Sequence, residues 1–97
     1  MLSPIRHEQN VRSGIFYINE KCDRKAFIVY FEDPENVLQL THTYVSDDLR
    51  GQGIANRLAE HVMEFALANN LKIIPVCSYI KKWLRNKVQY NKLLKPL

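Results

Sequence analysis

The sequence holds few of the residues that build disulfide frameworks, and it lacks long apolar runs. Its 97 residues include only two cysteines, Cys22 and Cys77. Two thiols alone make neither a metal site nor a disulfide framework, so free thiols in a reducing compartment are the default expectation. A disulfide between the two stays open at this point. No apolar run reaches the roughly 20 residues that a membrane-spanning helix needs.

The amino terminus also lacks the hydrophobic region of a signal peptide, so we expect a cytoplasmic protein. A chain of 97 residues, 46% of them hydrophobic, is typical of one globular domain that spans residues 1–97. A chain of this length can bury roughly 60 to 65% of its unfolded surface. We therefore expect it to fold without disulfide bonds or a structural metal ion.

Acidic residues are absent from the last third of the chain. No Asp or Glu follows Glu64, and the basic residues after it are Lys72, Lys81, Lys82, Arg85, Lys87, Lys92 and Lys95. Such a basic end attracts phosphate groups. The candidate partners are nucleic acid, an anionic surface and the phosphate of a cofactor.

The first half of the chain favours short β-strands joined by turns. β-Branched and aromatic residues predict strands at 14–18, 25–31 and 37–45, with a weaker edge strand within 5–11. The turns between them fall at 20–23 and 33–36. Apolar residues stand on both faces of 25–31, so we expect this strand to be central and covered on both sides.

The second half favours helices around one further strand. Apolar residues at helical spacing predict a helix over 54–69 that ends at Asn69 and Asn70, and the stripe is Ile54, Leu58, Val62 and Phe65. A short strand at 71–74 follows, and its connection through a long helix predicts parallel pairing. A short helix at 78–85 and a tail at 88–97 complete the chain. The fold class is α/β: an antiparallel meander, a β-α-β crossover and a short carboxy-terminal helix.

The loop before the long helix has the order of residues that a phosphate cradle needs. It reads Arg50-Gly51-Gln52-Gly53-Ile54-Ala55. Glycines let backbone N–H groups turn inward, and the helix behind them adds free N–H donors and the positive end of its dipole. The spacing is neither the Rossmann fingerprint nor a P-loop. By spacing alone, a tight turn with a solvent-facing arginine remains an alternative.

Pro75 interrupts the last strand. Proline has no N–H for a β-ladder, so pairing weakens there and two parallel strands can part. If the last strand starts beside residues 41–45, the gap would expose backbone to an extended ligand. The alternative is a strand that simply ends at Pro75.

Two side chains could carry chemistry. Cys77 precedes a helix with lysines one turn on, which favours a thiolate nucleophile, although a buried structural cysteine is an equal alternative from chemistry alone. His42 lies in the middle of a strand. It is a candidate general base or, more commonly for a lone histidine among apolar neighbours, a structural residue.

The segment from Arg50 to Ala55 matches Gln/Arg-x-x-Gly-x-Gly/Ala, the acetyl-CoA signature of the GCN5-related N-acetyltransferases (GNAT). The short length and the run from Pro75 to Tyr79 resemble the miniature single-domain branch of that superfamily. The resemblance implies a GNAT-like mixed sheet and binding of acetyl-CoA or coenzyme A. It places the cofactor beside Thr43, Tyr44, Val45, Arg50, Gly51, Gln52, Gly53, Ile54, Ala55, Ser78, Tyr79 and Lys82. It also favours catalytic roles for Cys77 and, secondarily, His42.

The resemblance therefore implies an N-acetyltransferase that moves an acetyl group from acetyl-CoA to an amine, either directly or through Cys77. Full-length relatives have helices after the first strand and a further hairpin after the last, and this chain has neither. The acceptor is therefore open: a protein lysine, a terminal amine, a small amine or a polyamine. The alternatives are a coenzyme A-binding module without turnover and, weighed least, a nucleic-acid-binding protein that uses Trp83 and Tyr90.

Overall fold

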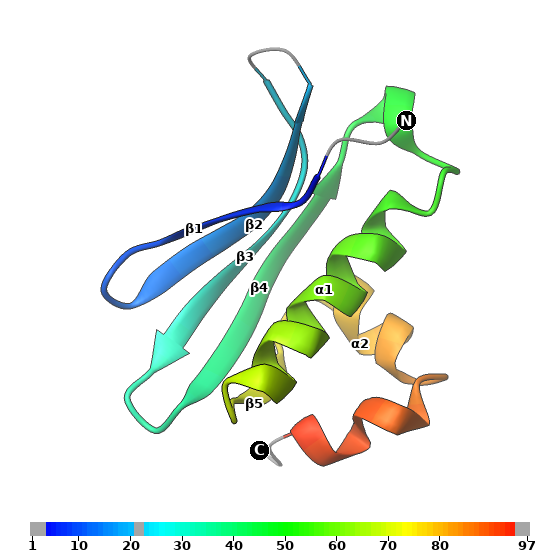
Figure 1. Ribbon diagram of the computed structural model, residues 1–97. Coiled ribbons are helices and arrows are strands. Elements are labelled where there is room, and N and C mark those ends of the chain that lie inside the picture. Colours follow the sequence, from blue (N-terminus) through cyan, green and yellow to red (C-terminus); the bar gives the residue numbers. More distant parts are fainter. Residues whose placement is uncertain (1–3, 21–22, 95–97) are drawn as a thin grey trace.

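Five strands form one mixed sheet in the order β1-β2-β3-β4-β5 in the computed structural model, which describes residues 4–20 and 23–94 (Figure 1). The first four strands pair antiparallel and β5 pairs parallel to β4, which confirms the predicted meander and crossover. The strands are β1 (Arg6–Gln9), β2 (Ser13–Glu20), β3 (Asp23–Asp33), β4 (Val37–Val45) and β5 (Lys72–Pro75). The weak edge strand expected within 5–11 is β1.

Helix α1 (Ile54–Ala68) lies across one face of the sheet, with α2 (Ser78–Leu84) beside it (Figure 1). A single-turn helix, η1 (Asp47–Leu49), links β4 to α1. The left-handed residue that ends α1 is Asn70, with φ 55°, as its position predicts. The segment expected as a tail forms a second 3₁₀ helix, η2 (Val88–Leu93).

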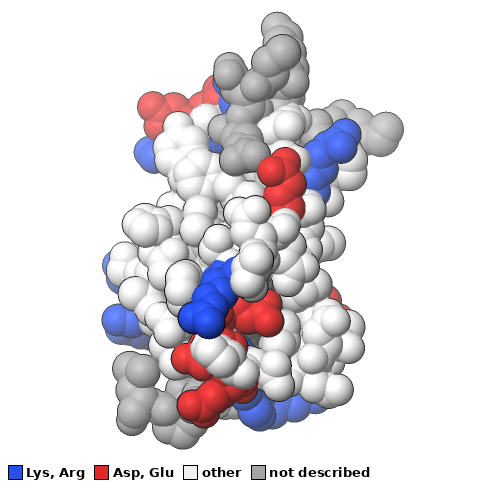
Figure 2. All heavy atoms as spheres, turned by 90° about the vertical axis from the view of Figure 1, so that its left-hand side faces the viewer, with Lys and Arg blue, Asp and Glu red and all other residues white. Residues whose placement is uncertain are grey.

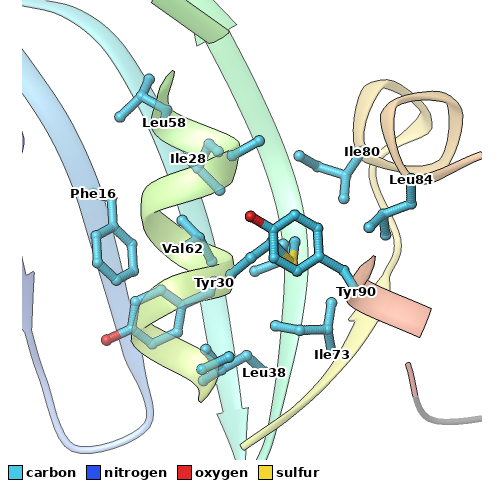
Figure 3. Close-up of a cluster of buried hydrophobic side chains, with 14 of the residues drawn as sticks. Phe16, Ile28, Tyr30, Leu38, Leu58, Val62, Ile73, Ile80, Leu84 and Tyr90 are labelled. Atoms are coloured by element: carbon cyan, nitrogen blue, oxygen red, sulfur yellow. The ribbon is translucent and has the colours of Figure 1, made fainter. Parts of the chain in front are cut away.

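The hydrophobic core lies between the sheet and the helices. Figure 3 shows Ile28 and Tyr30 of β3 in one cluster with Val62 of α1 and Ile80 of α2, and all four are buried. Trp83 of α2 donates a hydrogen bond from Nε1 to Asn56 Oδ1 of α1 at 2.7 Å. α2 is therefore fixed to the first turn of α1.

The two aromatic residues of the basic segment face inward rather than toward a partner. The Trp83 ring stacks on Tyr90, with centroids 5.7 Å apart, and Tyr90 is buried. This packing accounts for both aromatics without nucleic acid. The charged side chains visible in Figure 2, which shows the left-hand side of Figure 1, are of both signs and gather mainly in the lower half of that view.

β3 is the central strand of the sheet, as expected, but the prediction that both of its faces are covered is wrong. Its residues alternate, so that Ala26, Ile28 and Tyr30 enter the core while Phe27 and Phe31 stand on the other face. Phe31 is 45% exposed. In the described part of the chain both α1 and α2 pack on one side of the sheet, so the other face of β3 is not covered by a helix.

β4 contains one residue more than its partner strand requires. Val29 pairs with His42 and the next residue, Tyr30, pairs with Leu40, so Thr41 forms a β-bulge. The Thr41 hydroxyl donates to the Val29 carbonyl at 3.4 Å. The bulge turns the second half of β4 away from the line of the first half.

β4 and β5 part at this bulge. β5 pairs with residues Val37 to Leu40, and not with 41–45 as the sequence analysis assumed, and the last pair is Leu40 with Pro75. The Leu40 carbonyl then accepts the N–H groups of both Val76 and Cys77, at 3.0 and 2.9 Å. β5 thus ends at Pro75, as the alternative predicted, and the rest of β4 forms a free edge beyond the point where the two strands separate.

None of the helices in the described residues is long and apolar enough to cross a membrane. Cys77 is a free thiol. Cys22 lies outside the described residues, so the disulfide that the sequence left open stays untested.

Candidate functional site

The chain between β4 and α1 is held by local polar contacts. The Ser46 hydroxyl donates to the Asp48 carboxylate at 2.5 Å, and that carboxylate lies 3.6 Å from Lys25 Nζ. Arg50 lies against the same turn, with Nε 3.3 Å from the Val45 carbonyl oxygen and Nη1 3.1 Å from Asp47. These contacts fix where the loop enters α1.

Two glycines give the loop its shape. Gly51 and Gly53 have φ values of +82° and +72°, which residues with a Cβ rarely adopt. A Cβ built on either glycine would meet no atom within 4 Å. The backbone is therefore open to solvent at both positions, as a ligand that approaches it closely requires.

The first turn of α1 offers unpaired N–H donors. Gly53 is its N-cap, and no side chain caps the turn. The N–H groups of Ile54 and Ala55 have no helical partner because they precede the first intrahelical bond, which runs from Arg57 N–H to the Gly53 carbonyl. This end of α1 is suited to an anion.

Two adjacent hollows extend from this turn along the free edge of β4. Their volumes are about 240 and 270 Å³, and Val45, Arg50, Ala55 and Tyr79 line both. The first is also lined by Leu49, Gly51, Gly53, Ile54 and Asn56, and the second by Thr43 and Tyr44. We call the two hollows together the trough.

Most of the residues expected around a cofactor thus lie in the trough, and three do not. The Gln52 side chain donates to the Asp48 carbonyl at 3.2 Å, while Ser78 and Lys82 are exposed on α2. Two further residues of the trough, Leu49 and Asn56, were not expected from the sequence. Asn56 directly follows the glycine signature, and that position is the one sequence signal that could have indicated it.

Cys77 faces the free edge of β4. Its Sγ lies 3.5 Å from Thr43 Oγ1. Burial raises the pKa of the thiol, but hydrogen bonds from the Thr43 side chain and from the backbone of Ile80, Tyr79 and Thr43 lower it, and the net pKa is below the ordinary value. The thiolate is therefore more populated than in a free cysteine.

His42 lies on the opposite face of the sheet. Its partner across β3 is Val29, and its Nδ1 is 3.1 Å from Thr41 Oγ1. Since the Thr41 hydroxyl hydrogen is directed to the Val29 carbonyl, Oγ1 accepts the bond from Nδ1–H. The imidazole then keeps a free lone pair on Nε2. His42 and Cys77 are not in contact with each other.

Comparisons with known proteins agree with this architecture. The family model described as GCN5-related N-acetyl-transferase matches residues 15–93. Protein NATD1 of Homo sapiens is 33% identical over 96 residues, which cover 96% of this chain and 85% of NATD1.

Solved structures agree as well. The solution structure of a GCN5-like protein from Staphylococcus aureus has 35% identity and a TM-score of 0.72, covering 95% of this chain and 89% of that one. An acetyltransferase from Elizabethkingia anophelis with acetyl-CoA bound shares the fold at 15% identity, with a TM-score of 0.61 over 79% of this chain and 53% of that one. The chain therefore belongs to the GCN5-related N-acetyltransferase family.

Proposed function

We propose that this protein binds acetyl-CoA in the trough and transfers the acetyl group to an amine. The observation that carries the proposal is the continuity of the trough, which joins the uncapped first turn of α1 to the free edge of β4. An anionic group belongs at the first end and an extended polar arm at the second. Acetyl-CoA has both, and the E. anophelis relative of the same fold was solved with it.

The pyrophosphate would lie at the loop. The first hollow is lined by Gly51, Gly53, Ile54 and Ala55, and a Cβ at either glycine would meet no atom within 4 Å. Arg50 adds a positive charge beside it. Gln52 would contribute its backbone, since its side chain is bound to the Asp48 carbonyl. Ser78 and Lys82, exposed on α2, would meet the cofactor from its other side, with Lys82 toward the adenosine end.

The pantetheine arm would lie along β4. Beyond Leu40 the backbone of β4 has no β5 partner. The Thr43 backbone contacts the Cys77 thiol and the Val45 carbonyl accepts a hydrogen bond from Arg50, and the remaining N–H and C=O groups on that side would pair with a ligand. An amide-containing arm can pair with this edge as a missing strand would. The thioester would then lie near the bulge, between the Cys77 side and the His42 side of the sheet.

Two routes of transfer fit this arrangement. In the direct route, the lone pair of a neutral amine attacks the thioester carbonyl carbon, and a backbone N–H near Tyr44 or Val45 stabilises the oxyanion. The C–S bond breaks, coenzyme A leaves as a thiolate, and the amine proton passes to His42 Nε2 or to a water that it holds. In the covalent route, the Cys77 thiolate attacks the thioester carbon first and coenzyme A leaves as a thiolate. The amine then attacks the new thioester, Cys77 leaves as a thiolate, and the amine proton passes to a base or to water.

Mass spectrometry of the protein after exposure to acetyl-CoA without an acceptor separates the routes. Acetyl on the peptide that contains Cys77, removed when an amine is added, supports the covalent route. Release of coenzyme A only in the presence of an amine, from a protein that stays unmodified, supports the direct one. Binding of acetyl-CoA with no release of coenzyme A under any condition would reduce the protein to a non-catalytic binding module.

A further inference from the structure

The face of the sheet opposite α1 carries an uncovered group of apolar and aromatic side chains. Phe27, Val29 and Phe31 of β3 and His42 and Tyr44 of β4 stand there, and we call them the aromatic face. The Phe27 and Tyr44 rings lie 5.3 Å apart, and Phe31 and Tyr44 are each 45% exposed. None of the five belongs to the core cluster under α1. Core packing therefore does not account for them.

This face is continuous with the proposed acetyl-CoA site. Tyr44 lines the trough as well as pairing with Phe27. His42 comes two residues after Leu40, where β4 and β5 part. A molecule lying on the aromatic face would thus reach the free edge of β4 from the side opposite Cys77.

A base for an incoming amine lies within this face. The chain of hydrogen bonds from His42 Nδ1 to Thr41 and on to the Val29 carbonyl leaves Nε2 able to accept a proton. No described residue hydrogen-bonds to Nε2. The imidazole is thus oriented by the bulge and is free to act on a substrate.

Two carboxylates face the same side of the sheet but lie away from His42: Glu8 of β1 is separated from His42 by β2 and β3, and Asp33 is the last residue of β3. The five members of the aromatic face are uncharged, and so is Gln39, which pairs with Phe31 on the same side of the sheet. An amine that leaves water for such a surface has a lowered pKa, which raises the fraction of the neutral, nucleophilic form. A second ammonium group close to the first, as in a short diamine, would lose hydration beside His42 without an adjacent carboxylate to replace it.

Resting on the proposed function, we infer that the acceptor is a primary amine joined through a short linker to an apolar group of aromatic size. The apolar group would lie on Phe27, Phe31 and Tyr44, and the nitrogen would lie at His42 Nε2. Stacking on the exposed rings supplies the binding energy, and the uncharged surroundings supply the selection against short diamines. A small arylalkylamine and the free amine of a peptide that begins with an aromatic residue share this chemistry.

The test compares kcat/KM for coenzyme A release with matched amines, expressed per neutral amine at one pH. The probes are 2-phenylethylamine, butylamine and 1,4-diaminobutane, together with two short peptides that begin with Phe or with Ala. The expected result is about a tenfold preference for phenylethylamine over butylamine, in line with the worth of aromatic contacts, and a still lower value for diaminobutane. If the preference for the Phe peptide over the Ala peptide is larger than that for phenylethylamine over butylamine, the acceptor is the free amine of a peptide rather than a small arylalkylamine.

Phe31→Ser tests the surface itself, because Phe31 is exposed and lies outside the core cluster. The variant should reduce the ratio of phenylethylamine to butylamine several-fold, whereas Val11→Ser, at a residue 94% exposed on the β1–β2 turn, should leave it unchanged. Equal values for all amines, or a ratio indifferent to Phe31→Ser, would overturn the inference and leave the proposed function standing. Acetyl-CoA binding without release to any amine would contradict both.

Discussion

Cys77 Sγ and Thr43 Oγ1 lie 3.5 Å apart at the place where β4 and β5 separate. The Thr43 side chain and backbone contribute to the lowered pKa of the thiol, against the effect of burial. We predict that alkylation of Cys77 by iodoacetamide, followed by peptide mapping, rises with pH around a midpoint below the ordinary 9.0. Thr43→Val should move the midpoint up because the hydroxyl is lost.

Thr43→Ser keeps the hydroxyl and is the matched control for that shift. Saturating coenzyme A should slow the reaction if the trough is the cofactor site. A midpoint that is equal in wild type, Thr43→Val and Thr43→Ser would show that this contact does not tune the thiol.

The bulge residue Thr41 should act on catalysis through His42. Removing its hydroxyl in Thr41→Val releases His42 Nδ1, so the tautomer with a free Nε2 is no longer favoured. We expect kcat to fall about fivefold, the equivalent of one hydrogen bond of about 1 kcal/mol, while the KM for acetyl-CoA stays the same. Steady-state kinetics measure both quantities. Thr41→Ser should restore kcat, and a loss that serine does not rescue would point to a purely structural role.

Gly14 should be intolerant of any side chain. A Cβ at this position would lie 2.3 Å from the Cζ and hydroxyl oxygen of Tyr30, whose ring crosses β2 at the glycine. Gly14→Ala should therefore lower the free energy of unfolding by about 1–3 kcal/mol in urea titrations, the usual cost of overpacking. The cost should shrink in a Tyr30→Leu background, where the conflicting atoms are gone. An equal cost in both backgrounds would assign the loss to the backbone instead.

His7 should make stability fall in mild acid. Its Nε2 is 2.7 Å from the Tyr30 hydroxyl, and its ring stacks on Phe16 with centroids 4.0 Å apart. Burial, and then the charge of His61, lower the pKa of His7 from 6.5, while burial and Glu32 raise the pKa of Tyr30 to about 12. As pH falls below 6.5, the unfolded chain binds a proton that the folded protein resists, so stability decreases.

The measurement is the unfolding temperature of wild type and His7→Gln at pH 7.5 and 5.5. The decrease between the two should be smaller in His7→Gln, which has no imidazole to protonate. Asp48, whose pKa is lowered chiefly by the Ser46 hydroxyl, titrates below 3.8 and lies outside this window. Equal decreases in both proteins would remove His7 as the cause.

Local patterns predicted most of the elements of the fold. The stripe from Ile54 to Phe65 and the β-branched run at 37–45 each correspond to one element with nearly the expected ends. Parallel pairing of β5 followed from the helix that precedes it. What local patterns could not supply was the register, because it depends on where α1 ends and on the extra residue Thr41 in β4.

For the site, too, local sequence patterns indicated some residues, while the placement of others depends on contacts between distant parts of the chain. The glycine signature indicated the loop, and the expected cofactor residues from Thr43 to Ala55 largely lie along one trough. The part played by Asn56 depends on Trp83, which is 27 residues away and reaches it only through packing of α2. That His42 and Cys77 lie on opposite sides of β4 depends on the bulge. The bulge is an extra residue relative to the partner strand, so the alternation of residues within β4 alone does not reveal it.

The most direct test of the central claim is the unfolding temperature with and without acetyl-CoA, for wild type and Gly53→Glu. Ligand at 100 times its dissociation constant should stabilise wild type by about 2.7 kcal/mol. Glutamate at Gly53 adds a carboxylate at the first turn of α1 and strains a residue with φ +72°, so the ligand-induced shift should vanish. Val88→Glu adds the same charge at a residue 74% exposed outside the trough, and should keep the shift. A shift confined to wild type and Val88→Glu supports the trough as the acetyl-CoA site, whereas no shift in folded wild type, or an equal shift in Gly53→Glu, would contradict it.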